Sequence, residues 1–411
     1  MSYLMYRYTL INPPIEGGSS PYRNINLTRI NDQGQILGTA YPAATDASGW
    51  FLYADGSYTA LDVPGAASTT VRQLNEAGQV VGGYLDGTGA SHSFIYQDGD
   101  YSEVAIAGAA FTTVLQSSDS GTLLGTYFDA YGLHPFIYDD GHVTVLQVPD
   151  ASSTFIPNSS RTGGVGPFVN DAGQAIGGYT DAAGNHTFLF DGDHYTTLAI
   201  SGNDRINPVE INNKGEVLGT WYDGVGTRSF VYANGTYKEI TVPGAQSTTA
   251  VDINDDGAVA GTYYDGIGTH AFLYTGGAYI TLDPVASDPA SYSYASVSQL
   301  TDSGLVLGQF NNGGRSGPFL YQDGQVTFVD VPGATTSSFS DINDLGQLIG
   351  TFSDGVTSHG VLATPGSTDL VPPPSHAGKV DMSRDHEAKM PHWSGQDPSM
   401  PKPPGLLISP I

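Results

Sequence analysis

The chain has 411 residues, with 41 Asp and Glu against 14 Lys and Arg, for a formal net charge of −27. This balance argues against nucleic-acid binding and against binding to anionic lipid, because both need clustered basic side chains. Cysteine is absent, which excludes disulfides, thiolate zinc sites and a cysteine nucleophile.

The N-terminal segment, residues 1–14, has no basic region followed by a continuous apolar run, so no signal peptide is visible. No stretch of the chain approaches the length of uninterrupted apolar residues that a membrane-spanning helix needs. Residues Tyr8–Pro14 instead align without a gap on Tyr58–Pro64, a predicted strand at the end of the first internal repeat.

That repeat follows the pattern apolar-Asn/Asp-x-x-Gly-x-apolar-apolar-Gly and recurs eight times, at intervals of 42 to 52 residues. Ile30–Gly38 is the first copy. Each unit predicts four short strands, as at 79–85 for the second strand, 92–96 for the third and 58–63 for the fourth. Gly, Asn and Asp between them supply the positive φ of tight hairpin turns. The sequence therefore predicts an all-β fold, an eight-bladed β-propeller of residues 1–364 with four antiparallel strands per blade.

The last repeat lacks its fourth strand, because none follows His359–Ala363. Tyr8–Pro14 is predicted to complete that blade and close the ring, and Thr368–Pro372 is an alternative closing strand. Extra residues at 152–166 and 287–294 are predicted in connections from a fourth strand to the next first strand. These connections share a face with the second-to-third hairpins, and we expect binding there. Residues 365–411 predict a Pro-rich extended or disordered tail.

Acidic and basic side chains recur around the hairpin between the second and third strands. They could bind sugar hydroxyls or a cation, or they could form a structural clamp in which Asp accepts a hydrogen bond from His across the turn. Repetition in most blades favours the clamp. The pairs are Asp86 with His92, Asp129 with His134, Asp181 with His186, Asp223 with Arg228, Asp265 with His270, and Asp354 with His359.

Three further features bear on ligands. Asp252, Asn254 and Asp256 match the first half of a calcium loop, but Tyr263 stands where an EF-hand needs Glu, and hairpin-turn chemistry is the favoured explanation of Asn-Asp-x-Gly. Calcium is therefore the only cofactor that the sequence suggests. Trp50 and Trp221 are candidate platforms for a ligand, although aromatic residues at such positions more often pack between blades. No motif of a serine hydrolase, zinc protease, phosphate-binding loop or dinucleotide site is visible.

The repeats resemble the bacterial "probable extracellular repeat, HAF family". His270-Ala-Phe272 carries the family tripeptide, and His92-Ser-Phe94 is a degenerate form of it. The resemblance covers roughly residues 6–364. It implies a secreted or surface protein of unassigned biochemistry and transfers no catalytic residues.

From these observations we expect a monomeric, non-enzymatic extracellular or surface binding module whose partner is a glycan or another extracellular ligand. The absence of a visible signal peptide leaves a cytoplasmic location open. One alternative is a propeller glycan hydrolase or lyase that uses acidic residues at the channel mouth. Another is a structural repeat scaffold stabilised by calcium.

Overall fold

The computed structural model describes residues 6–13, 22–42, 48–139, 141–157, 167–200, 206–283, 294–311, 316–366 and 405–408. The regular secondary structure of these residues consists of strands, which confirms the all-β prediction. No helix with the length and hydropathy of a membrane span occurs among them.

Each repeat contributes strands that pair antiparallel in chain order, from an inner strand to an outer one. The inner strands are β2 (Tyr22–Ile30), β6 (Ser68–Leu74), β10 (Phe111–Ser117), β14 (Ser153–Phe155), β18 (Ile206–Ile211), β22 (Ser247–Ile253), β26 (Tyr294–Leu300) and β30 (Thr336–Ile342). The second strands are β3 (Ile36–Pro42), β7 (Val80–Leu85), β11 (Leu123–Asp129), β15 (Ala175–Thr180), β19 (Val217–Tyr222), β23 (Val259–Tyr264), β27 (Val306–Asn311) and β31 (Leu348–Ser353).

The third strands are β4 (Gly49–Ala54), β8 (Ser91–Gln97), β12 (Gly132–Asp139), β16 (Asn185–Phe190), β20 (Thr227–Ala233), β24 (Thr269–Thr275), β28 (Ser316–Gln322) and β32 (Ser358–Pro365). The outer strands are β5 (Ser57–Ala60), β9 (Asp100–Ile106), β13 (His142–Val145), β17 (Tyr195–Leu198), β21 (Thr236–Ile240), β25 (Ala278–Thr281), β29 (Gln325–Phe328) and β1 (Tyr6–Ile11). A last short strand, β33 (Gly405–Ile408), pairs with β9.

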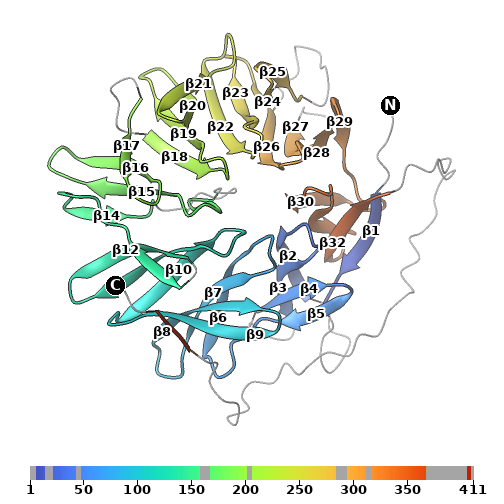
Figure 1. The fold of residues 1–411 in the computed structure, drawn as a ribbon. Coiled ribbons are helices and arrows are strands. Elements are labelled where there is room, and N and C mark those ends of the chain that lie inside the picture. Colours follow the sequence, from blue (N-terminus) through green and yellow to red (C-terminus); the bar gives the residue numbers. More distant parts are fainter. Residues whose placement is uncertain are drawn as a thin grey trace.

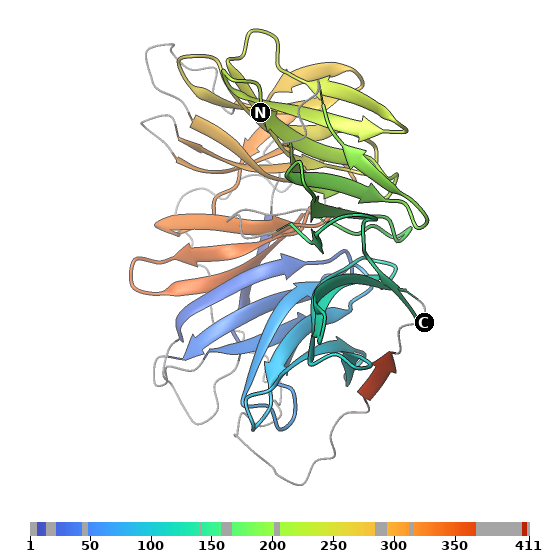
Figure 2. The ribbon, with the colours of Figure 1, turned by 90° about the vertical axis from the view of Figure 1, so that its left-hand side faces the viewer.

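Among the described residues, five sheets have four strands, one has five and one has eight. The eight-stranded path consists of two repeats joined by a single parallel pair, Thr269 opposite Tyr294. Figure 1 shows the sheets following one another around a common centre, and Figure 2 shows the same succession from the side. This arrangement gives the molecule its propeller-like character.

Strand β1 joins the chain's N-terminal end to its last repeat. It pairs antiparallel with β32 along its whole length, from Tyr6 opposite Pro365 to Ile11 opposite Gly360. The resulting order, β1-β32-β31-β30, gives the last repeat four strands. The alternative strand at Thr368–Pro372 lies outside the described residues.

A glycine–phenylalanine pair explains why the second glycine of the motif recurs. Gly82 on β7 lies opposite Phe94 on β8, whose ring is fully buried. A Cβ on Gly82 would lie 2.6 Å from the Phe94 ring and 2.4 Å from the Thr70 carbonyl oxygen. The same pairing recurs in seven repeats, where the buried rings are Phe51, Phe94, Phe136, Phe188, Phe230, Phe272 and Phe319. The phenylalanine of His-x-Phe is therefore a core residue that only glycine can accommodate.

One prediction about the connections is wrong. The extra residues of the fourth repeat do not simply lengthen the connection before its inner strand, because Ser153–Phe155 already pairs with β15 as strand β14. The chain re-joins this sheet at Val169, which bridges to Ala175. The insertion therefore interrupts the inner strand, and residues 158–166 within it lie outside the described part. So do residues 287–293 of the other insertion and most of the tail. Strand β33 was not foreseen.

Candidate functional site

Buried amides join neighbouring sheets where each inner strand ends. Asn31 sits at the end of β2, its Oδ1 accepts a hydrogen bond from the Gln35 backbone N–H within its own turn, and its Nδ2 donates to the Asn75 carbonyl of the next sheet. These contacts explain why the motif needs Asn, which carries both an acceptor and a donor. The inter-sheet bonds of this type, 2.7–3.1 Å long, run from Asn31 to Asn75, Asn75 to Ser118, Asn170 to Asn212, Asn212 to Asn254, Asn254 to Thr301 and Asn343 to Asn31.

Two repeats have another residue in place of the asparagine and form the inter-sheet hydrogen bond with a different side chain. Ser118 and Thr301 occupy its position, and each is followed two residues later by a serine. The hydroxyl of Ser120 donates to the Asp171 carbonyl at 3.2 Å, and that of Ser303 donates to the Asp344 carbonyl at 3.0 Å. The inter-sheet bond is thus kept by a different side chain.

The residue after each asparagine forms a second series of inter-sheet bonds. In each case a backbone N–H of one sheet donates to a side-chain oxygen of the next, at 2.6–3.0 Å. The acceptors are, in order, Glu76, Asp119, Asp171, Asn213, Asp255, Asp302, Asp344 and Asp32. The last bond, from the Asp344 N–H to Asp32 at 2.8 Å, returns the series to the first repeat.

A third series starts, in six repeats, two residues before the asparagine position. Gln73 accepts the Ser117 N–H at 2.9 Å, and its amide donates back to the Ser117 carbonyl. Acidic residues replace glutamine at three equivalent positions, Glu210, Asp252 and Asp341, which accept the N–H groups of Ile253, Leu300 and Ile30. Arg29 departs from this pattern because a guanidinium cannot accept a hydrogen bond. Its Nη1 lies 3.7 Å from the Asp341 carboxylate instead.

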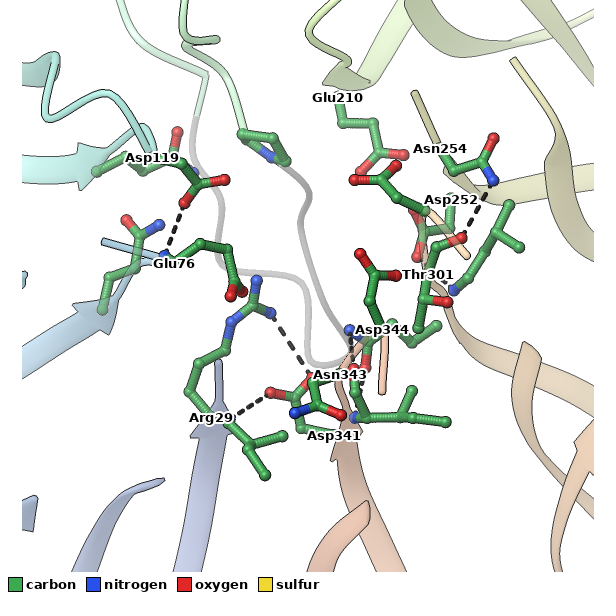
Figure 3. Close-up of a pocket in the computed structure, with 18 of the residues that line it drawn as sticks. Arg29, Glu76, Asp119, Glu210, Asp252, Asn254, Thr301, Asp341, Asn343 and Asp344 are labelled. Carbon is green, nitrogen blue, oxygen red and sulfur yellow. Dashed lines mark hydrogen bonds and ion pairs between the residues drawn. The ribbon is translucent and has the colours of Figure 1, made fainter. Parts of the chain in front are cut away.

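These side chains line a central cavity of about 1090 Å³. Its walls are the inner strands and the turns that follow them, and Figure 3 shows the labelled side chains surrounding a common space, with Arg29 across from Glu210. Two arginines, Arg29 and Arg72, lie in the lining with ten carboxylic residues. The carboxylic residues are Asp32, Glu76, Asp119, Asp171, Glu210, Asp252, Asp255, Asp302, Asp341 and Asp344.

Burial and mutual repulsion raise the pKa values of several of these carboxyls. Desolvation, followed by the charges of Asp32 and Asp119, raises the pKa of Glu76 to about 7. Desolvation, with the charges of Asp255 and Asp344, raises the pKa of Asp302 to about 6. Burial likewise raises the pKa of Asp341, although Arg29 opposes the shift. The cavity thus holds more acid than it can ionise fully at neutral pH.

Glu210 and Asp252 form a carboxyl–carboxyl pair. Glu210 is only 4% exposed, and the two side chains are hydrogen-bonded to each other. Desolvation is the main reason that the pKa of Glu210 lies well above its usual range, and the charge of Asp252 adds to the shift. A proton held on Glu210 and shared with Asp252 accounts for this contact.

The predicted Asp and basic-residue pairs all form, at 2.7–3.4 Å. Each Asp also accepts backbone N–H groups of its own turn; Asp265, for example, accepts those of Ile267 and Gly268. These turn bonds are the chief reason that the pKa of Asp265 lies below its usual range. The five histidines stack on an aromatic ring of the second strand, as His92 does on Tyr84 at 4.8 Å. The contacts are those of the structural clamp.

The other predicted ligand residues have separate surroundings. Trp221 is 7% exposed and packs on Phe230, so its interpretation as an exposed platform is wrong, and Trp50 packs partly buried in the core of the first two repeats. Asn254 accepts the N–H groups of Asp256 and Ala258, as a turn residue does. Asp256 lies 3.6 Å from Lys214, and Asp252 faces the cavity. No group of three or more His, Asp or Glu suited to a metal occurs in the described residues, and calcium binding stays a prediction.

The residues that line the cavity were not predicted from the sequence to form one site. Their signal was present, because the residue after the motif asparagine is acidic in seven of the eight repeats. That acidity was attributed to hairpin chemistry, which does not need it at this position. The cavity lies at the turns between inner and second strands, whereas binding was predicted at the hairpins at the other end of the second strands.

No protein-family model and no curated protein matches the chain. Among solved structures, dipeptidyl peptidase 4 of Porphyromonas gingivalis is similar with a TM-score of 0.51 and 8% identity, over 82% of this chain and 58% of that one. Virginiamycin B lyase from Staphylococcus aureus, in a catalytically inactive form with quinupristin, has a TM-score of 0.35 and 10% identity over 88% and 99% of the two chains. The SapL1 lectin with α-methyl fucoside has a TM-score of 0.29 and 11% identity over 77% and 98%. At these identities the likeness concerns the fold alone, which is propeller-like.

Proposed function

We propose that the chain is a closed eight-bladed β-propeller that acts as a binding module and takes a cationic ligand into its central cavity. The charge of that cavity carries the proposal: ten carboxylic residues and two arginines line about 1090 Å³. The pairing of β1 with β32 and the hydrogen-bond series that returns to Asp32 support the closed ring. An extracellular or surface location, which the HAF resemblance implies, is part of the same proposal.

The physical argument rests on field focusing. A recess with walls of low polarisability and one sign of charge concentrates counter-ions of the other sign. The inter-sheet bonds to Glu76 and Asp302 each use one carboxylate oxygen, Oε2 and Oδ1 respectively. An ammonium ion with several N–H donors suits the remaining acceptor capacity, and its charge would relieve the repulsion that raises these pKa values.

A glycan ligand on the hairpin face has less support. The Asp and His side chains there already make contacts with one another and with the turn backbone, so binding a sugar would first require those contacts to break.

Glycoside hydrolysis by the buried pair also has less support. Glycosidases hold their two carboxyls roughly 5 Å apart or more, to leave room for the sugar or a water. Glu210 and Asp252 are in direct hydrogen-bond contact, and Glu210 serves the same structural bond as Gln73 in its own repeat. The geometry is that of a joint between sheets.

Isothermal titration with spermine, a tetra-cation, tests the proposal. We expect binding that weakens at least about tenfold in the Glu76→Gln/Asp302→Asn double variant and strengthens several-fold in Arg29→Gln, which removes a competing positive charge. Asp193→Asn, which removes one charge from an exposed turn, is the matched control and should bind as wild type does. Equal binding by all four proteins, or no binding by any, would refute the cavity as the site.

A further inference from the structure

Strand β33 lies on the open edge of one particular outer strand. It runs parallel to β9, with Gly405 opposite Glu103 and Ile408 opposite Ile106. Figure 2 shows it on the outside of the molecule. β9 has 7 residues, whereas five other outer strands have 4 and β21 has 5. Part of this length comes from the pairing itself, because Ala105 and Ile106 pair with β33 and not with β8.

The residue that follows β9 explains why this edge accepts a strand. The same position after the outer strand is Pro64, Pro149, Pro243 and Pro332 in four repeats, whereas it is Ala107 after β9, Ser201 after β17 and Val285 after β25. The turn is otherwise the same, because the Ala109 N–H donates to the Ile106 carbonyl at 3.0 Å just as the Ala66 N–H donates to the Val63 carbonyl. A proline has no N–H group, so it cannot donate a hydrogen bond to a strand that pairs with the sheet edge. The absence of proline leaves the end of β9 available for pairing.

The direction of the backbone supports this reading. The Ile106 N–H donates to Thr112 Oγ1 of the next sheet at 3.0 Å. Successive N–H groups of a strand point to opposite sides, so the N–H of Ala107 is directed to the side on which β33 lies. In the proline-bearing repeats that side has no donor at this position.

We propose that the edge of β9 is a docking site for a short apolar strand, that the chain's own C-terminal segment occupies it, and that the N–H of Ala107 is required for this docking. The partner's chemistry is that of Gly-Leu-Leu-Ile, an uncharged segment held chiefly by its backbone. Residues 366–404 connect β32 to β33 within one chain. A tether of this length gives an effective concentration near the millimolar range, so docking within one chain outcompetes a second copy at micromolar protein.

Hydrogen–deuterium exchange of the full-length chain tests the site. Leu406→Pro removes from β33 a backbone N–H that faces β9, because Glu103 and Ala105 are the β9 residues directed to β33 and Leu406 lies opposite the position between them. Ala107→Pro gives β9 the ending found after four other outer strands. In both variants we expect amides of residues 101–106 to exchange at least about tenfold faster, while those of β21, whose edge carries no added strand, keep their wild-type rates. Unchanged exchange at β9 in either variant would overturn the proposal. Faster exchange at β21 as well would mean general destabilisation and would also count against it.

A synthetic N-acetylated peptide of residues 405–411 tests the specificity. At about 5 mM, comparable to the tether's effective concentration, it should restore protection of β9 in Leu406→Pro but not in Ala107→Pro. Failure to protect Leu406→Pro, or equal protection of both variants, would refute an apolar strand site that depends on Ala107. Dimerisation of Leu406→Pro through the opened edge, seen by light scattering, would assign the site to a second copy instead and overturn the proposed occupant.

Discussion

Moderate acidification should stabilise this fold, because its cavity carboxyls have raised pKa values. A carboxyl of this kind contributes stability that is complete below its unfolded-state pKa, near 4, and is lost as the pH rises through its folded-state pKa. For Glu76 the loss runs from its ordinary pKa of 4.5 to about pH 7, and for Asp302 from 3.8 to about pH 6. Hairpin carboxyls such as Asp354, whose pKa the turn N–H groups lower to about 2, act in the opposite sense and lose their contribution in stronger acid. Maximal stability should therefore lie near pH 5.

The size of the effect follows from the shift. Raising the pKa of Glu76 from 4.5 to about 7 corresponds to roughly 3 kcal/mol of free energy of unfolding. Water in the cavity screens this carboxyl, which reduces the contribution to about 1.5 kcal/mol. For a folded part of this size, that is a change of about 2 °C in the unfolding midpoint.

Glu76→Gln isolates the contribution of the Glu76 charge to the free energy of unfolding. The Gln amide oxygen can still accept the Asp32 N–H, as the Asn213 amide oxygen accepts the Asp171 N–H at the equivalent position. At about pH 7.5 the variant should melt about 2 °C above wild type, and at about pH 5 the two should coincide. Thermal unfolding by circular dichroism at both pH values is sufficient, with Asp193→Asn as the control for a lost surface charge. A variant less stable than wild type at the higher pH, or a difference that does not depend on pH, would contradict the reasoning.

Three further predictions concern the joints and the core. Asn343→Ala should lower the free energy of unfolding in urea by about 2–3 kcal/mol, because it removes the buried amide that bonds to Asn31 and Gln347. The Asn343→Ser/Leu345→Ser variant should recover about half of this loss, because it can form the inter-sheet bond that Ser120 forms in its own repeat. If the double variant is no better than the alanine variant, the serine bond does not substitute for the amide. Gly82→Ala should lower the free energy of unfolding by more than about 3 kcal/mol, because its Cβ would clash with the Phe94 ring and the Thr70 carbonyl. Gly87→Ala, which has open space around its Cβ, should leave the stability unchanged, and similar losses in both variants would disprove the steric role. His270→Gln should lower the melting temperature and leave spermine affinity unchanged, and a parallel loss of affinity would return the hairpin face to the binding site.

The sequence was sufficient for the all-β fold and for the approximate position of most strands, because every repeat has the same pattern. Glycine spacing located the turns, and the likeness of Tyr8–Pro14 to Tyr58–Pro64 anticipated the pairing of β1 with β32. The interruption of the inner strand after Phe155 was beyond the same reasoning, since a change in spacing gives the length of an insertion and not its place. Strand β33 was missed because a four-residue apolar run far from the repeats has no periodicity to mark it.

The candidate site was harder to predict because contacts between repeats do not follow from spacing within one repeat. Glu76, Asp302 and Asp341 lie far apart in the chain and share a cavity because the inner strands converge on one axis. The Asp–His pairs, five or six residues apart, were easier to see, and proximity in sequence drew the functional interpretation to them. Their regularity was the better guide to their structural role.

In a repeat protein the residues that most units share serve the joints between units, so a role confined to one unit is best sought where that unit departs from the others. Arg29 departs by placing a cation beside Asp341 where Gln73 accepts a backbone N–H, and Glu210 with Asp252 departs by sharing a proton where Gln73 has an amide. Ala107 departs by keeping an N–H group where four other repeats have proline. The first two departures face the cavity and the third faces an open sheet edge. Each can be changed to the residue type of its equivalents, as in Arg29→Gln, Glu210→Gln and Ala107→Pro, and the resulting change in binding or docking can then be measured.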